Sequence, residues 1–257
     1  PPAPPPPPLP PASPRACFAK DGLVVMTGVL DSATLAAARR EVDALYVGVS
    51  AAALEAQDCV LDLLDDVGVP PTAAARVDCA AFSDMRQRAG GTPAVTGGIL
   101  GGLAAGVQAV CGWPAVFHFS THFVVKPPGS VSEFRWHRDA DLQLAMCPTQ
   151  QPYASLWCAL DDTHPGNGSL TLLPASTGLA PADVDDTRPQ ADPPGAVTVT
   201  VAAGDAVLFD STLWHRSGPN TSPHPRRVLY VQYSPAAIMA PDGRAPLCFA
   251  VPCTGAP

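Results

Sequence analysis

The chain has little positive charge and almost no lysine. Lys20 and Lys126 are its two lysines, and Lys and Arg together number 15 against 23 Asp and Glu, which gives a net charge of −8. A surface that binds nucleic acid needs clustered Lys and Arg to neutralise phosphates. We therefore expect no nucleic-acid partner.

Long uninterrupted hydrophobic runs are also missing. The most apolar stretch, residues 94–112, is interrupted by glycines and bounded by Pro93 and Pro114. A membrane-spanning helix needs about 20 mostly apolar residues, and glycine is a weak helix former. We expect no membrane association, and a short buried helix from about 99 to 111.

Cysteine pairs with metal-binding spacing are absent as well. The eight cysteines form no Cys-x-x-Cys pair, which argues against a zinc ribbon, and we expect most of them to be small buried hydrophobes. Their spacing leaves disulfides open. No secretory signal pattern is visible, and a targeting segment removed from upstream of this sequence stays open as an alternative. We expect an intracellular rather than a secreted protein, and a monomer.

Proline is abundant at the start of the chain. Residues 1–14 include ten prolines and have no apolar periodicity, so residues 1–16 are expected to form an extended arm or linker, with an interaction arm as the alternative. A single domain should then occupy residues 17–257. Its helical part should cover 17–113 and its β core 114–240.

Helical patterns fill much of the first half. Residues 31–48 predict an amphipathic helix capped by Asp31 or Ser32, and residues 51–66 predict a second helix with a solvated acidic face. A short strand is expected at 22–26. These helices should cover the outer face of one sheet.

After Pro114 the pattern changes to short strands, and no further helix is expected. The strands are rich in β-branched and aromatic residues and are separated by Pro, Gly and Asn turns, which is typical of a jelly roll. The predicted strands are 116–126, 132–139, 154–161, 169–173, 196–201, 206–210 and 226–234.

The chemistry is concentrated in the triplet His137-Arg138-Asp139. On an extended strand His137 and Asp139 project to one side, and His215 follows another apolar strand pattern. Two histidines and one carboxylate are the ligand set of non-haem Fe(II) oxygenases. The triplet also resembles the protein-kinase catalytic loop, but that loop needs an Asn where this chain has Leu144.

The surroundings of these residues resemble one family. The segments VVKPPGSVSEFRWHRDADLQ, SLWCALDDTHPGNGSLTLLPAS and GDAVLFDSTLWHRSGPNTSPHPRRVLYVQYSP are similar to the phytanoyl-CoA dioxygenase (PhyH-like) family of Fe(II)- and 2-oxoglutarate-dependent oxygenases. The resemblance implies a double-stranded β-helix (cupin-like jelly roll) and a metal site of His137, Asp139 and His215. It also implies O2-dependent decarboxylation of 2-oxoglutarate to succinate, coupled to hydroxylation of a small-molecule substrate.

The resemblance further implies a co-substrate site. Arg226 and Ser217 match the family positions that bind the distal carboxylate of 2-oxoglutarate, and Lys126, Ser120 and His122 share a strand face turned towards it. His122 is read as a pocket wall, with a fourth metal-site residue as the alternative.

Alternation along residues 226–234 separates two adjacent arginines. Arg226 shares a face with Val228, Tyr230 and Gln232, whereas Arg227 belongs to the more apolar face, which should pack under the helices. Arg226 is therefore predicted to face the pocket, with Arg227 near an edge where its head reaches water.

The sequence departs from the family pattern at LLPASTGLA, where relatives have a Pro-Gly-Ser-His turn. Substrate contacts should come from residues 141–153 and 175–195, which are predicted to be irregular loops. Two other functions stay open: a catalytically silent jelly-roll binding or scaffold protein, and a metal-dependent cupin-like enzyme that uses no 2-oxo acid.

Overall fold

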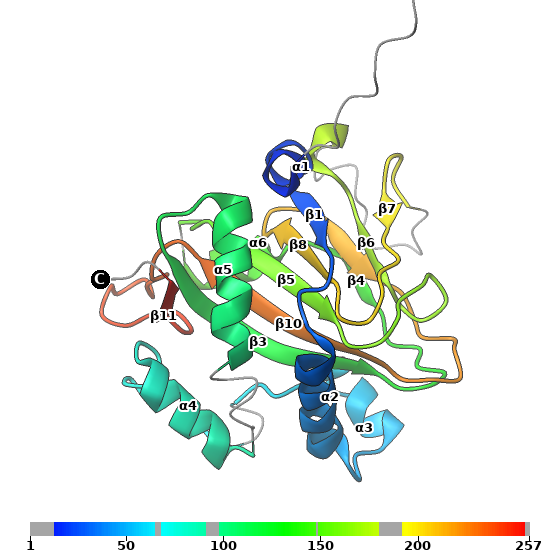
Figure 1. Cartoon of the computed structure of the whole chain (residues 1–257), viewed down its shortest axis with the longest axis horizontal. Helices are drawn as coiled ribbons and strands as arrows, with labels where there is room; N and C mark the ends of the chain where they lie inside the picture. The colour runs from blue at the N-terminus through cyan, green and yellow to red at the C-terminus, as the bar shows by residue number, and fades with distance from the viewer. Residues whose placement is uncertain (1–12, 65–67, 91–97, 148, 180–191, 255–257) are drawn as a thin grey trace, which may run out of the picture.

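The core consists of two antiparallel β-sheets (Figure 1). The computed structural model describes residues 13–64, 68–90, 98–147, 149–179 and 192–254. In the larger sheet the order is β1 (Leu23–Met26), β8 (Ala206–Asp210), β5 (Ala154–Ala159), β10 (Arg226–Ser234), β3 (Val116–Lys126) and β11 (Val251–Thr254), with β2 (Val60–Leu61) also on β3. The smaller sheet has β4 (Phe134–His137), β9 (His215–Ser217), β6 (Leu170–Leu172) and β7 (Val197–Thr198). This is the predicted jelly roll, mainly β with flanking helices.

Helices cover one face of the larger sheet, as the sequence predicts (Figure 1). They are α1 (Pro14–Asp21), α2 (Ser32–Tyr46), α3 (Ala51–Glu55), α4 (Cys79–Arg88) and α5 (Leu100–Cys111). The main hydrophobic core lies between them and the sheet. There Leu229, Val231 and Tyr233 of β10 are fully buried, and the Tyr233 hydroxyl donates to the Leu100 carbonyl at 2.7 Å. The predicted alternation of β10 is confirmed.

The N-terminal expectations need two corrections. Helix α1 begins at Pro14, inside the range expected to be an arm, because Ser13 caps it and proline fits the first helical turn. The expected helix over 51–66 ends at Glu55, and Asp58, Cys59 and Asp62 then adopt positive φ. Pairing of β2 with β3 replaces the helix, since the sheet edge satisfies its backbone groups. Residues 1–12 and 65–67 lie outside the described part.

Helix α4 was not expected, and its contacts explain it. Arg86 is buried and donates to Glu41 at 2.8 Å and to Asp62. Asp62, expected on a solvated face, is therefore buried in an ion pair that joins α4, α2 and the turn after β2. Prediction from amphipathic periodicity assigns charged residues to the exposed face, so it cannot identify a helix that is held by a buried arginine and two carboxylates.

The second half also differs in detail. Helix α6 (Asp139–Met146) follows β4 directly, so residues 141–153 are not a purely irregular loop and a helix does return after Pro114. Strands β9 and β11 were not anticipated. A short 3-10 helix, η2 (Ala175–Thr177), lies in the second expected loop, whose residues 180–191 lie outside the described part. All eight cysteines are free, and three rather than most of them are buried.

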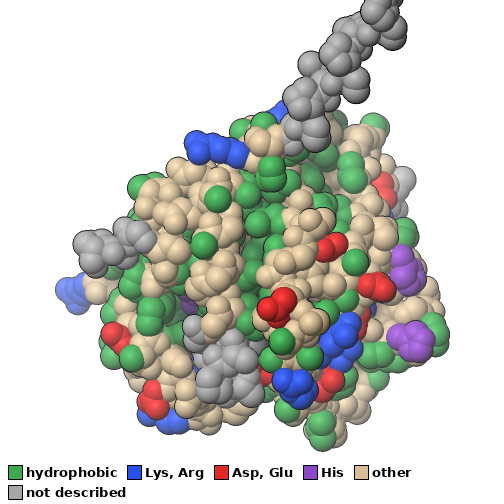
Figure 2. Space-filling model, in the orientation of Figure 1, with side chains coloured by type: hydrophobic (Ala, Val, Ile, Leu, Met, Phe, Trp, Pro, Cys, Tyr) green, Lys and Arg blue, Asp and Glu red, His purple; other side chains and the backbone are tan. Residues whose placement is uncertain are grey.

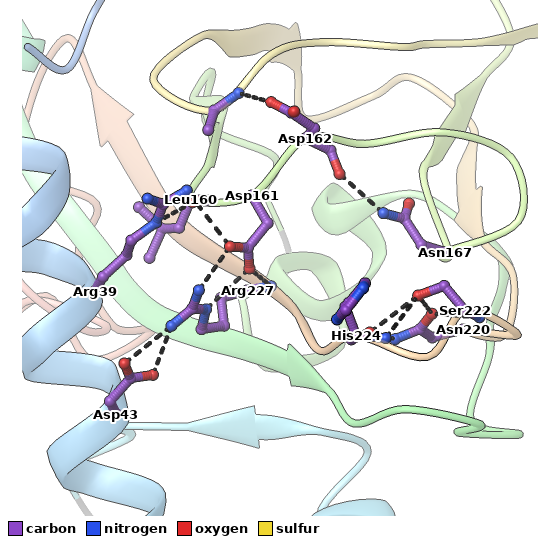
Figure 3. A network of polar contacts seen from close by, with 11 residues as sticks. Arg39, Asp43, Leu160, Asp161, Asp162, Asn167, Asn220, Ser222, His224 and Arg227 are labelled. Carbon is purple, nitrogen blue, oxygen red and sulfur yellow. Dashed lines mark hydrogen bonds and ion pairs between the residues drawn. The ribbon is translucent and has the colours of Figure 1, made fainter. Parts of the chain in front are cut away.

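A polar network fastens α2 to β10 (Figure 3). Arg227 donates to both oxygens of Asp43 at 2.7 and 2.9 Å and to Asp161 at 2.6 and 2.9 Å. Arg39 of α2 donates to the Leu160 carbonyl at 2.7 Å. Arg227 is thus committed to a structural contact on the helix side of the sheet, with its side chain 15 % exposed.

Charges of both signs are interspersed on the face seen in Figure 2. No described helix has the length and apolar character needed to cross a membrane.

Candidate metal and co-substrate site

Three elements bring the candidate ligands together. His137 is the last residue of β4 and pairs directly with His215, the first residue of β9. Asp139 is the first residue of α6. The strand predicted to carry both His137 and Asp139 therefore ends at the histidine, two residues before the aspartate. The two side chains still project together because Arg138, between them, keeps an extended backbone with φ −120° and ψ 134°.

The ligand atoms converge. One atom from each residue lies within 4.8 Å of the other two. Asp139 Oδ1 is 3.8 Å from His137 Nε2 and 3.5 Å from His215 Nε2. The Nδ1 atoms contact the carbonyls of Arg135 at 2.7 Å and Leu213 at 3.0 Å. These carbonyls fix the tautomer with the proton on Nδ1, which leaves both Nε2 lone pairs for an ion.

The second oxygen of Asp139 is held by the larger sheet. Oδ2 accepts from Ser155 Oγ at 2.5 Å, from the Tyr230 hydroxyl and from Gln232 Nε2 at 3.1 Å. Three donors on one oxygen leave Oδ1 facing the two histidines. Alternation along β10 predicts Tyr230 and Gln232 on the pocket face, as observed. Ser155 was not predicted, because its only signal in the sequence is its position within the alternation of β5.

Charge states suit a divalent cation. Burial alone would raise the pKa of Asp139, but His215, His137 and the Ser155 hydroxyl outweigh it and hold that pKa below its usual range. Burial, followed by the neighbouring His215, lowers the pKa of His137. The site therefore offers an ionised carboxylate and a neutral imidazole, the forms that bind metal.

A cavity of about 610 Å³ adjoins the triad, and Arg226 lines it. Arg226 is 1 % exposed, lies over the Trp157 ring at 5.6 Å and donates from Nη2 to Ser217 Oγ at 3.3 Å. Its Nη1 is buried with no hydrogen-bond partner among the described residues. A buried guanidinium with an unpaired donor is expected to bind an anion, and a carboxylate matches it in shape and charge.

The other three residues predicted at the co-substrate site, Lys126, His122 and Ser120, do not lie together. Lys126 is fully buried and donates to the carbonyls of Ser132, Ser217 and Gly218, at 3.1, 3.1 and 2.5 Å. Lys126 does not line the cavity, contrary to the prediction, because its ammonium group binds these three backbone carbonyls instead.

His122 and Ser120 do line the cavity, at different positions along β3. His122 stacks on Tyr230 at 4.9 Å, and burial lowers its pKa to about 4, so it is a neutral wall residue. Ser120 lies opposite Gln232, six residues from the partner of Arg226, which is about 20 Å along an extended strand. It is therefore far from the Arg226 end.

Comparisons with known proteins match this arrangement. The family model of phytanoyl-CoA dioxygenase (PhyH) matches residues 18–228. The chain belongs to the phytanoyl-CoA dioxygenase family. Iron as metal, with 2-oxoglutarate and O2 as co-substrates, accompanies membership of this family of oxygenases, and the triad and Arg226 fit those groups.

Individual relatives are more distant. The ectoine dioxygenase of Nocardia farcinica (strain IFM 10152) is 28 % identical in an alignment of 240 residues that covers 84 % of this chain and 75 % of that protein. The non-heme monooxygenase ThoJ in its Ni complex has 24 % identity and a TM-score of 0.57, with 86 % of this chain and 77 % of that chain covered. EctD from S. alaskensis with 2-oxoglutarate and 5-hydroxyectoine has 20 % identity and a TM-score of 0.55, with 92 % and 78 % covered. The two structures share the fold with this phytanoyl-CoA dioxygenase family member.

Proposed function

We propose that the protein hydroxylates a small-molecule substrate, with O2 as oxidant and 2-oxoglutarate as co-substrate. One oxygen atom enters a substrate C–H bond to give an alcohol, and the other enters succinate as CO2 is lost. The observation that carries this proposal is the combination, in one cavity, of converging His137, Asp139 and His215 with the unpaired Nη1 of buried Arg226.

Each residue has a defined task. His137 and His215 through Nε2, and Asp139 through Oδ1, would hold the iron, which supplies O2 activation when bound. Ser155, Tyr230 and Gln232 keep the second oxygen of Asp139 occupied, so that the carboxylate cannot rotate away. Arg226 would pair with the distal carboxylate of 2-oxoglutarate, and Ser217 accepts from the same guanidinium and steadies it.

The first test is 2-oxoglutarate-dependent succinate formation by the purified chain with Fe(II) and O2, without added substrate. Slow uncoupled turnover is expected in the native protein and its loss in Asp139→Ala. Arg227→Ala is the matched control, because Arg227 points away from the cavity into the contacts with Asp43 and Asp161. No succinate, together with unchanged metal affinity in Asp139→Ala, would favour a silent binding protein.

The type of reaction needs a second measurement. SnoN, which shares the fold at 21 % identity and a TM-score of 0.53, is named an epimerase, so the fold alone does not fix the outcome. Incubation of a metabolite mixture under ¹⁸O2 should yield a product that carries one labelled oxygen. A product of unchanged mass would contradict hydroxylation.

A further inference from the structure

Helix α6 carries a second cavity residue besides the metal ligand. Gln143 lies four residues after Asp139, on the same face of the helix, and both line the cavity. Gln143 is 1 % exposed. Its Oε1 accepts from the Gln151 backbone N–H at 2.7 Å, which fixes the amide orientation.

The other end of this amide is unsatisfied. Gln143 Nε2 is buried and has no acceptor among the described residues. A buried amide donor without a partner destabilises the protein, so we expect a molecule bound in the cavity to supply the hydrogen-bond acceptor. Neither the metal site nor the Arg226 end uses this donor.

Gln143 lies one helical turn from Asp139, and the strand register separates the Asp139 end of the cavity from the Arg226 end. Along β10, Arg226 is at one end of the cavity floor, while Gln232, which contacts Asp139, lies six residues further on. Near Gln232 the wall is aromatic, with Phe119 and Tyr153 at 5.1 Å between ring centroids. With 2-oxoglutarate at Arg226, the space beside α6 is left for the primary substrate.

The rim of this space is apolar. Leu142 and Met146, one helical turn apart on α6, line the cavity and are 67 % and 55 % exposed, and lining Leu63 is 38 % exposed. Exposed aliphatic side chains at a cavity mouth mark a surface that an apolar ligand covers.

Charges at the mouth do not favour an anion. Apart from Arg226, which the proposed function assigns to 2-oxoglutarate, two arginines line the cavity: Arg216 is paired with Asp192 at 2.6 Å, and Arg135 lies 3.9 Å from Glu133. Asp58, also a lining residue, adds a further negative charge. A coenzyme A thioester or a free carboxylate would therefore meet no uncompensated cation within the described rim.

From these observations, and resting on the proposed function, we infer that the primary substrate is an uncharged, largely apolar molecule with an acceptor oxygen. Gln143 Nε2 donates to that oxygen, and Leu142 and Met146 cover the apolar body. Because Gln143 and Asp139 share one helix, this contact fixes the distance between the substrate oxygen and the metal site.

The test uses probes of known chemistry on the full chain loaded with Mn(II) and 2-oxoglutarate. Binding of two neutral ketones, camphor and 2-nonanone, is compared by titration calorimetry with binding of the anions camphorsulfonate and nonanoate, and with ectoine. At least one ketone should bind at least tenfold more tightly than its anion and than ectoine. Equal or tighter binding of the anions or ectoine, or no binding of either ketone, would overturn the inference.

Substitutions test the two contacts separately. Gln143→Glu keeps an acceptor for the Gln151 N–H, and Gln143→Met keeps the volume without charge; both should weaken ketone binding roughly fivefold through loss of the donor. Leu142→Glu should weaken it about tenfold, whereas Leu144→Glu, on the same helix but outside the cavity lining, should leave it within about twofold. Ketone affinity unchanged in both Gln143 variants would mean that water alone satisfies the amide, and would refute the assignment.

The two proposals fail in different ways. Absence of 2-oxoglutarate binding and of uncoupled succinate in the native chain would remove the proposed function. Normal 2-oxoglutarate binding without preference for neutral ketones would remove only the substrate inference. Thermal unfolding of each variant separates a lost contact from a lost fold.

Discussion

The adjacent residues Arg226 and Arg227 give the sharpest test of the site, because they differ in one respect, the face of β10. Arg226 is on the cavity side with an unpaired Nη1, and burial lowers its pKa to about 10, so it stays charged at neutral pH. Arg227 is on the helix side and its donors are taken up by Asp43 and Asp161. Substitution of each by alanine should therefore affect different properties.

Arg226→Ala should reduce 2-oxoglutarate affinity more than a hundredfold. A charge-assisted pair in a buried site, together with the cost of leaving the ligand carboxylate unpaired, is worth on the order of 3 kcal/mol. Arg226→Lys should retain only part of the native 2-oxoglutarate affinity, since an ammonium cannot offer two parallel N–H donors. The unfolding temperature of Arg226→Ala without ligand should equal that of the native protein, because Arg226 has no strong ionic partner among the described residues.

Arg227→Ala should change 2-oxoglutarate affinity by less than about threefold but lower the unfolding free energy by roughly 2 kcal/mol, as hydrogen bonds to two carboxylates are lost. Titration of 2-oxoglutarate into the Mn(II) form, with thermal unfolding in parallel, measures both effects. The reverse ranking of the two variants in affinity would show that the cavity assignment of β10 is wrong.

Three further outcomes are expected. Asp139→Ala and His215→Ala should each lower Fe(II) affinity at least tenfold, as measured by metal titration, with the fold retained; unchanged affinity in both would end the triad assignment. Tyr230→Phe should lower Fe(II) affinity about tenfold through loss of the hydroxyl donor to Asp139 Oδ2, and an unaltered value would show that Ser155 and Gln232 suffice. Burial lowers the pKa of His118 to about 3 from 6.5, so the unfolded chain binds the proton first and stability is lost as pH falls from about 6.5 towards 3. In His118→Phe the unfolding free energy, measured by denaturant titration at each pH, should fall less steeply between pH 6.5 and 3. An equally steep fall would show that His118 is not its cause.

The sequence was most informative where a strand separates two chemically different faces. In β10 one face is Leu229, Val231 and Tyr233, and the other is Arg226, Tyr230 and Gln232. A shift by one residue would turn the polar side chains towards the helices and the apolar side chains towards the cavity, so the register is strongly determined. The same contrast is present in β3, and the bounds of both strands agree with the prediction.

The sequence was least informative where tertiary contacts overrule local pattern. The helix expected over 51–66 gave way to β2 because β3 offers Val60 and Leu61 a hydrogen-bonded edge. Helix α4 depends on Arg86, whose partners Glu41 and Asp62 are 45 and 24 residues away. No window of local sequence contains both halves of such a contact.

The start of α6 at Asp139 changes what the His-x-Asp motif can do. As a strand residue, Asp139 would be followed by residues that alternate away from the metal. As the first residue of a helix, it is followed one turn later by Gln143 on the same face, with Leu142 and Met146 towards the mouth. One short helix thus joins the candidate metal ligand rigidly to the surface that would contact substrate. Substitutions three to seven positions after Asp139 should therefore alter the substrate preference of this chain without changing the candidate metal ligands.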